Sequence, residues 1–452
     1  MKYVKNVNEL IVMQKFQQNF KNWTSGNDII DKFIQDTQLS AHSNYEAPRA
    51  LEWIPYDKFA NIKYVAKGGF GKVYKANWID GCMDNKWNIK NQNWRRIRQN
   101  MFVALKSLNN SKDVTSEFMN EIMSHHKIRD PFSIIKFYGI TQDPKTKDYM
   151  MVLDYAKDGN LRDVLPDTSA SGWEYKLYYF YCISLGLEHI HDMGLIHRDL
   201  HTGNILVGHL VYITDLGLCK PANYKKSKKN AKTYGIIPYM APEILRRQDY
   251  TKAADIYSFG IIMYEIISGL RPYHNVCHDE NLTIQICNGL RPRFNIKVPQ
   301  LIVDLIKRCL DADPSNRPMM EEIRKITCHW LYEYIHTFDK PTEFQKQMKE
   351  VEETNKLSAG SIPSTSEIHP GAIYTSRLLN FNNLPEPKNS DDYYNNYDNI
   401  SNMEYSGSAS TRMKTVIRIT QKKNPDYIRI DPDFESGSDN PDRNRKPDWI
   451  YK

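Results

Sequence analysis

Asp199, Asn204 and Asp215 are the residues whose types and spacing most clearly indicate chemistry. They lie in residues 196–206, which read IHRDLHTGNIL, and in the DLG sequence of residues 215–217. Two carboxylates and an amide carbonyl supply hard oxygen atoms, which are the ligands that Mg²⁺ prefers in proteins. A polar loop with one capping aspartate would explain Asp199 alone, but it does not explain the whole set. We therefore predict a site for a hard cation around these three residues.

A short hairpin is expected to bring these side chains together. Residues 204–207 and 210–214 are apolar and β-prone, and the glycine and histidine between them suit a two-residue turn. Asn204 and Asp215 would then lie at the same open end of the hairpin, with Asp199 in the loop that leads into it.

A glycine-rich segment lies between two β-prone runs in the first half of the chain. Residues 67–71 read KGGFG, and residues 59–66 and 72–78 flank them. Glycines between two strands let backbone N–H groups approach a phosphate closely. Taken alone, this segment is a weak signal of phosphate binding.

Lys106 ends the apolar strand FVALK of residues 102–106, and Glu121 lies on the helical pattern of residues 117–128. A lysine near phosphates gains from a carboxylate that holds it in place, so we expect the two side chains to meet. The alternative is an exposed surface ion pair, which would contribute little to stability.

The pattern of elements predicts an α+β fold with a β-rich first lobe, a helix-rich second lobe and a cleft between them. The β-rich part continues through residues 134–140 and 149–155, and residues 82–100 are expected to form an extended hairpin connection. Helical periodicity then dominates in residues 173–193, 254–267, 281–288, 301–310 and 319–330.

The composition limits the classes of protein to which the chain can belong. At 452 residues it exceeds one compact core, and its net charge of +7 is too dispersed to indicate nucleic-acid binding. Seven cysteines without zinc-like spacing indicate reduced thiols. No apolar run approaches the ~20 residues that span a bilayer, and the first residues lack the apolar core of a signal peptide. We expect a cytoplasmic protein, with the nucleus left open, that binds neither nucleic acid nor a membrane.

The two ends of the chain differ from its middle. Residues 1–54 carry two short helical patterns, which either pack on the following domain or form a docking module for a partner. Residues 336–452 are expected to form a low-complexity, largely disordered tail, because they carry too little apolar surface to offset the entropy of ordering. Within this tail, residues 341–356 could form a charged helix, and residues 415–420 form a short β-prone island.

In order along the chain, these motifs resemble the eukaryotic protein kinase catalytic domain, in its tyrosine-kinase-like branch, over residues 55–335. The resemblance implies a bilobal fold that uses ATP and Mg²⁺ and acts on protein substrates. It also implies that Asp199 is the catalytic base and that Lys106 holds the α- and β-phosphates of ATP. Asn204 and Asp215 are the implied metal ligands.

The resemblance further implies an ATP-binding surface that includes the glycine loop, the strand lysine, the hinge and the residues around adenine. Its predicted members are Val65, Gly68, Gly69, Gly71, Val73, Ala104, Lys106, Glu121, Leu153, Asp154, Ala156 and Leu206. In the hinge, the Asp154 carbonyl and the Ala156 N–H would meet the adenine ring, and Leu153 would be the gatekeeper.

Structural and regulatory roles also follow from the resemblance. Glu243, in the APE sequence of residues 241–243, would form a buried ion pair with Arg317, and Asp255 would brace the catalytic loop of His197 and Arg198 from below. In such kinases the loop arginine often pairs with a phosphorylated residue of the activation segment. Candidate phosphate acceptors in that segment are Ser227, Thr233 and Tyr234.

Four positions depart from the usual kinase pattern. Ala66 replaces the first glycine of the loop, and Leu216 replaces a phenylalanine with another apolar side chain. His201 stands where serine/threonine kinases carry a lysine, and Ile236 stands where they carry a threonine. These last two departures leave the preference between serine, threonine and tyrosine hydroxyls open.

The sequence therefore favours a protein kinase that transfers the γ-phosphate of ATP to serine or threonine, with tyrosine left open. Its partners would be protein substrates and either an upstream kinase or a second copy acting in trans. A catalytically weak pseudokinase or scaffold that binds ATP and partners is the main alternative. A small-molecule kinase is disfavoured, because Glu243 and Arg317 belong to a platform for peptide substrates.

Overall fold

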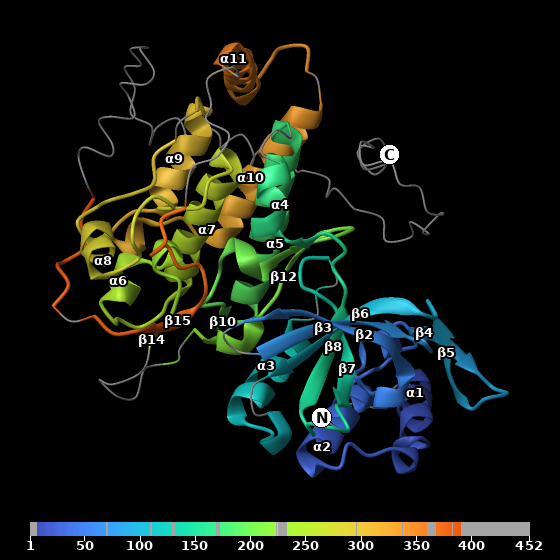
Figure 1. Cartoon of the computed structure of the whole chain (residues 1–452). Helices are drawn as coiled ribbons and strands as arrows, with labels where there is room; N and C mark the ends of the chain where they lie inside the picture. The colour runs from blue at the N-terminus through green and yellow to red at the C-terminus, as the bar shows by residue number, and fades with distance from the viewer. Residues whose placement is uncertain are drawn as a thin grey trace, which may run out of the picture.

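The chain folds into a sheet-rich lobe and a helical lobe, which lie side by side (Figure 1). The structure is a computed structural model that describes residues 7–68, 71–108, 111–128, 130, 132–168, 172–222, 224, 233–294, 296–336, 338–358, 368–381 and 383–389. Strands predominate before residue 155 and helices after residue 161. The predicted α+β, bilobal architecture is therefore confirmed.

A six-stranded sheet forms the first lobe, in the order β1-β7-β8-β6-β3-β2. Its strands are β1 (Glu52–Trp53), β2 (Phe59–Lys67), β3 (Gly71–Trp78), β6 (Met101–Leu108), β7 (Phe137–Gln142) and β8 (Tyr149–Asp154). The neighbours pair antiparallel except β1, which pairs parallel to β7. The kinase domain was expected to begin at residue 55, which would leave out β1, although β1 is a strand of the same sheet. Two residues are too few to show the alternating pattern of a strand in the sequence.

The elements outside this sheet cover the first lobe. The predicted hairpin connection is present as β4 (Cys82–Asn88) and β5 (Asn93–Ile97), which pair with each other. Helix α1 (Val7–Gln17) packs on this hairpin, with the Phe16 and Trp94 ring centroids 5.3 Å apart. Helix α2 (Asp28–Leu39) buries Ile30 and Ile34 against α3 (Ser116–Lys127). Of the two alternatives for the N-terminal helices, the structure shows packing on the domain.

Helices build the second lobe around one large apolar cluster. They are α4 (Leu161–Thr168), α5 (Trp173–Asp192), α6 (Pro242–Leu245), α7 (Lys252–Ser268), α8 (Glu280–Cys287), α9 (Gln300–Cys309) and α10 (Met320–Ile335). Helix α7 lies at the centre, because nearly all of its side chains are buried. Although α7 is strongly apolar, no helix in the described part of the chain combines the length and apolar character needed to cross a bilayer.

Short strands position the loops at the junction of the lobes. Strand β11 (Ile205–Val207) pairs with β12 (Val211–Ile213) and with β9 (Gly159–Asn160), and β10 (Leu195–Ile196) pairs with β13 (Lys220–Pro221). The predicted β11–β12 hairpin is present, but its turn has three residues, not two. Val207 pairs with Val211, and the Gly208 N–H donates to the Leu210 carbonyl at 3.0 Å, so residues 208–210 make the turn.

The expectation of a largely disordered tail is wrong for residues 338–358, 368–381 and 383–389. Helix α11 (Glu343–Ser358) buries Phe344, Met348 and Val351 in the core of the second lobe. Further on, β15 (Arg377–Leu379) pairs antiparallel with β14 (Thr233–Gly235), along the lower edge of that lobe (Figure 1). A few well-placed apolar side chains order these segments, although their average composition is polar. The predicted island at residues 415–420 lies outside the described residues.

Replacing Phe344 by alanine tests whether α11 belongs to the folded domain. The Phe344 ring stacks on Trp330 with centroids 5.4 Å apart and is 2% exposed. We expect Phe344→Ala to lower the free energy of unfolding by about 3–5 kcal/mol, the usual cost of truncating a buried aromatic side chain. Urea unfolding measures this change, with the exposed Lys349→Ala in the same helix as the control. Equal stability of the two variants would contradict the packing of α11.

Candidate active site

Lys106 of β6 contacts two carboxylates. Its Nζ is 2.6 Å from Glu121 Oε1 and 3.0 Å from Asp215 Oδ1. Lys106 lies in β6, Glu121 in α3 and Asp215 in the segment after β12. The apolar side chains of each element pack in the core and so bring the three residues together. The predicted Lys106–Glu121 pair is therefore present, and it is buried, so the exposed surface pair is excluded.

The electrostatics of this cluster keep Lys106 charged. Burial alone would lower the pKa of Lys106, but the Asp215 and Glu121 carboxylates more than offset it and raise the pKa. Gly217 leaves room for the arrangement, since a Cβ there would lie 2.9 Å from Glu121 Oε2. Asp215 itself adopts a left-handed backbone conformation with φ 61°, which a non-glycine residue holds only when its surroundings fix it.

The loop that carries Asp199 is held from below by Asp255 of α7. The Asp255 carboxylate accepts hydrogen bonds from the backbone N–H groups of His197 (2.8 Å) and Arg198 (2.9 Å), and it lies 3.0 Å from His191 Nε2. His197 Nε2 in turn lies 3.1 Å from the Thr214 carbonyl, next to Asp215. This buried network fits the bracing role predicted for Asp255, and it links the loop to the DLG segment.

Asn204 and Asp215 offer oxygen atoms suited to Mg²⁺. Asn204 Nδ2 donates to the Asp199 carbonyl at 2.8 Å, which leaves its amide oxygen available as a ligand. Within the described part of the chain, no three His, Cys, Asp or Glu side chains form a complete metal site. Mg²⁺ does not require one, because it commonly binds one or two protein oxygens while phosphates and water complete its octahedron. The residues present therefore fit the ion.

The predicted adenine-binding residues gather where β6, β8 and β11 meet. Ala104 pairs with Leu153 across β6 and β8, and Leu206 packs on the same apolar cluster. Val73 lies opposite Lys106 on β3, whereas Val65 on β2 is 49% exposed.

The hinge and the glycine loop flank that surface. Asp154 ends β8, and the Ala156 carbonyl accepts from the Gly159 N–H at 3.4 Å. In the glycine loop, the Gly68 N–H donates to the Gly71 carbonyl at 2.9 Å, while Gly69 lies outside the described residues.

His201 is buried beside Asp199, at 3.8 Å between Nε2 and Oδ2. Burial and the neighbouring Arg162 hold the pKa of His201 well below its ordinary value, so the ring is neutral at physiological pH. Arg162 of α4 lies 3.2 Å from His201 Nδ1 and provides the positive charge in this part of the site. No motif in the sequence indicates Arg162, and its role depends on tertiary packing.

Asp199 has an unusual environment for a carboxylate. Burial and the nearby Asp215 carboxylate raise the pKa of Asp199 to about 7. The Ser376 hydroxyl and the Arg162 guanidinium oppose this rise. Ser376 belongs to the segment that was expected to be disordered. The apolar and aromatic cluster of residues 372–381 is the sequence signal that could have revealed it.

The predicted pair of Glu243 and Arg317 is present and buried. Arg317 Nη1 and Nη2 donate to the two Glu243 carboxylate oxygens at 2.7 and 2.8 Å. Arg317 also donates to the Asp311 and Ala253 carbonyls, both at 2.9 Å. This fork of charge-assisted hydrogen bonds ties α6 to the turn before α10.

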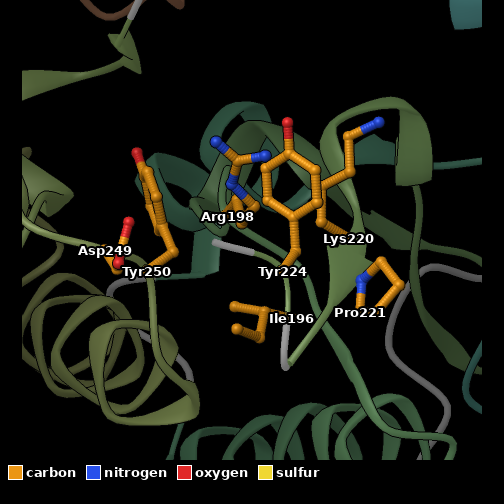
Figure 2. A pocket seen from close by; sticks show the side chains of 7 residues that line it. All are labelled: Ile196, Arg198, Lys220, Pro221, Tyr224, Asp249 and Tyr250. Carbon is orange, nitrogen blue, oxygen red and sulfur yellow. The ribbon is translucent and has the colours of Figure 1, made fainter. Parts of the chain in front are cut away.

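Arg198 lies in a small pocket near the activation segment, which Figure 2 shows from close by. Its guanidinium stacks over the Tyr250 ring at 4.4 Å from the centroid, and Tyr224 and Lys220 line the same pocket. The candidate phosphate acceptors of the activation segment differ in their burial. Thr233 is buried in β14, Tyr234 is half-buried beside it, and Ser227 lies outside the described residues.

The two lobes, with Lys106 in contact with both Glu121 and Asp215, define a protein kinase catalytic domain. The comparison with known families agrees. Residues 59–326 match the family described as protein tyrosine and serine/threonine kinase, which is more than half of the chain. The chain belongs to this family, and the resemblance seen in the sequence is confirmed.

Similar proteins bear kinase names. Human "Mitogen-activated protein kinase kinase kinase 7" is 30% identical over 339 residues, which are 71% of this chain and 50% of that protein. "Probable serine/threonine-protein kinase drkD" of Dictyostelium discoideum is 27% identical over 314 residues, 68% of this chain and 22% of that protein. The chain thus spans about half the length of the first of these relatives and about a fifth of the second.

Proposed function

We propose that this chain is an active protein kinase that transfers the γ-phosphate of ATP to protein hydroxyl groups. The observation that carries the proposal is the buried contact of Lys106 with both Glu121 and Asp215. Family membership and the kinase names of the relatives support it. The pseudokinase alternative receives no support from these comparisons.

In the proposed mechanism, the residues of the chain position the reactants and balance charge. The Lys106 ammonium, held by Glu121, orients the α- and β-phosphates of ATP. Asp199 aligns the acceptor hydroxyl and takes its proton, and a carboxyl with a raised pKa of about 7 suits that task. Asp215 and Asn204 would hold Mg²⁺, which when bound neutralises the charge of the phosphates.

We further propose serine or threonine as the acceptor in substrates. The names of several relatives contain "serine/threonine-protein kinase", which favours this preference for the present chain. His201 and Ile236 replace the residues that serine/threonine kinases usually carry, but Arg162 supplies a cation in the same place. The proposed partners are therefore proteins with exposed serine or threonine side chains.

Substitution of the central residues tests the function. We expect Lys106→Met and Asp215→Asn to abolish transfer of ³²P from labelled ATP to dephosphorylated casein. Asp199→Asn should slow transfer by ~10²- to 10⁴-fold, the usual range for a lost general base. Lys63→Met, which removes an exposed lysine of β2, is the matched control and should retain activity. Phosphoamino-acid analysis of the casein identifies the acceptor, and activity retained in Lys106→Met would contradict the assigned roles.

We also propose that phosphorylation of the activation segment regulates the enzyme. Arg198 and Lys220 line one pocket and could receive a phosphate from Ser227, Thr233 or Tyr234. An upstream kinase or a second copy acting in trans would add the phosphate. Phosphatase treatment should then slow turnover of casein, whereas an unchanged rate would count against this regulation.

A further inference from the structure

The segment of residues 368–381 crosses the helical lobe next to the active site. Its strand β15 pairs with β14, in the register Gly235–Arg377, Tyr234–Leu378 and Thr233–Leu379. Strand β14 directly precedes Ile236 and the loop that leads to Glu243. An extended segment is therefore added as a strand to the part of the chain that lies between Asp215 and Glu243.

Tyr374 anchors this segment at its other end. The side chain is 7% exposed, its hydroxyl donates to the Pro272 carbonyl at 2.9 Å, and its ring packs on His278 at 4.8 Å between centroids. The Tyr374 carbonyl accepts from Arg162 Nη1 at 2.8 Å, and the same guanidinium lies beside His201. Arg162 thus links Tyr374 to the surroundings of Asp199.

Ser376 lies between these two points of attachment, and the geometry directs it to the catalytic loop. Its Oγ is buried and makes no hydrogen bond of regular geometry with the described residues. Arg162, which donates to the Tyr374 carbonyl, lies 3.2 Å from His201 Nδ1, and His201 Nε2 lies 3.8 Å from Asp199 Oδ2, so this stretch of chain passes next to the catalytic loop. The Ser376 hydroxyl acts there to lower the pKa of the Asp199 carboxyl. Neighbouring Thr375 is exposed, so of the two adjacent hydroxyl groups only that of Ser376 is buried.

We propose that Ser376 is a phosphorylation site of this chain, modified in cis by its own active site. The inference rests on the proposed kinase function. A segment that merely braced the lobe would need the Tyr374 and Leu379 contacts, but it would have no need of a hydroxyl beside Asp199. The contacts also describe the substrate class, which is an extended peptide with an aromatic residue two positions before the acceptor and a basic residue directly after it.

The chemical step uses only ATP as a second reactant. A bond forms between Ser376 Oγ and the γ-phosphorus, and the bond from that phosphorus to the β,γ-bridging oxygen breaks. ADP leaves with the bonding electron pair, and the hydroxyl proton passes to the Asp199 carboxylate. The product phosphoserine carries about −1.5 to −2 charges. Because it would face Asp199 and Asp215, like-charge repulsion favours departure of the segment from the site.

While the segment of residues 368–381 occupies this position, it also excludes other peptides from the active site. Attachment to the same chain gives Ser376 an effective concentration on the order of millimolar at its own site. Departure of β15 after phosphorylation would uncover Thr233 and the surface around it for other substrates.

The test measures phosphate on Ser376 in the full-length, dephosphorylated chain after addition of Mg·ATP, by mass spectrometry. We expect phosphorylation with a first-order rate constant that stays the same on about tenfold dilution, as an intramolecular step requires. Ser376→Ala should lose this phosphate, while Thr375→Ala, the matched control, should keep Ser376 phosphorylated. An isotopically heavy Asp199→Asn chain, mixed with the light wild-type chain, should remain unmodified at Ser376.

Other outcomes separate the inference from the proposed function. Ser376 left unmodified while casein is phosphorylated would overturn the inference alone. Equal phosphorylation of the heavy and light chains would overturn the cis step. If neither casein nor Ser376 is phosphorylated, the proposed function fails, and the inference fails with it.

A second variant tests the anchor. Tyr374→Ala should slow Ser376 phosphorylation by roughly 10- to 100-fold, since burial of an aromatic side chain is lost. It should also accelerate phosphorylation of casein, because the segment leaves the site more often. Ile373→Ala, at an exposed neighbouring position, is the control. Faster casein phosphorylation without slower Ser376 phosphorylation would contradict the anchoring role.

Discussion

The buried ammonium group of Lys106 is the constraint on which the arrangement of the site depends. Its contacts with Glu121 at 2.6 Å and Asp215 at 3.0 Å join the sheet, helix α3 and the DLG segment at one point. A buried cation that lost one of these partners would leave an uncompensated charge, which typically costs about 3–5 kcal/mol. The approach of α3 to the sheet and the absence of a side chain at Gly217 both follow from the need to satisfy this charge.

Asp255 provides a second fixed point, on the opposite side of the site. Helix α7 is buried along almost its whole length, so it offers a rigid base for a carboxylate that orients two backbone N–H groups of the catalytic loop. The positions of Asp199 and Asn204 are therefore fixed by helix α7 through Asp255. The two fixed points together hold the predicted ATP-binding groups of both lobes in place.

The sequence predicted these fixed points because they are carried by local motifs. The strand that ends in Lys106, the helix with Glu121 and the hairpin before Asp215 each have a hydrophobic pattern that identifies them. Arg162 and Ser376 could not be predicted in this way, because both act through contacts between distant parts of the chain. The average composition of residues 336–452 also concealed the apolar side chains that order α11 and β15. Composition describes a whole segment, whereas packing depends on single residues.

The coupling of Lys106 and Glu121 in nucleotide binding tests the account most directly. Calorimetric titration with Mg·ATP of the wild type, Lys106→Met, Glu121→Gln and the double variant gives a thermodynamic cycle. If Glu121 acts by holding Lys106, the coupling free energy should be about 1–3 kcal/mol, and the second substitution should add little to the first. Independent, additive losses of affinity would contradict the central role of the buried ammonium group.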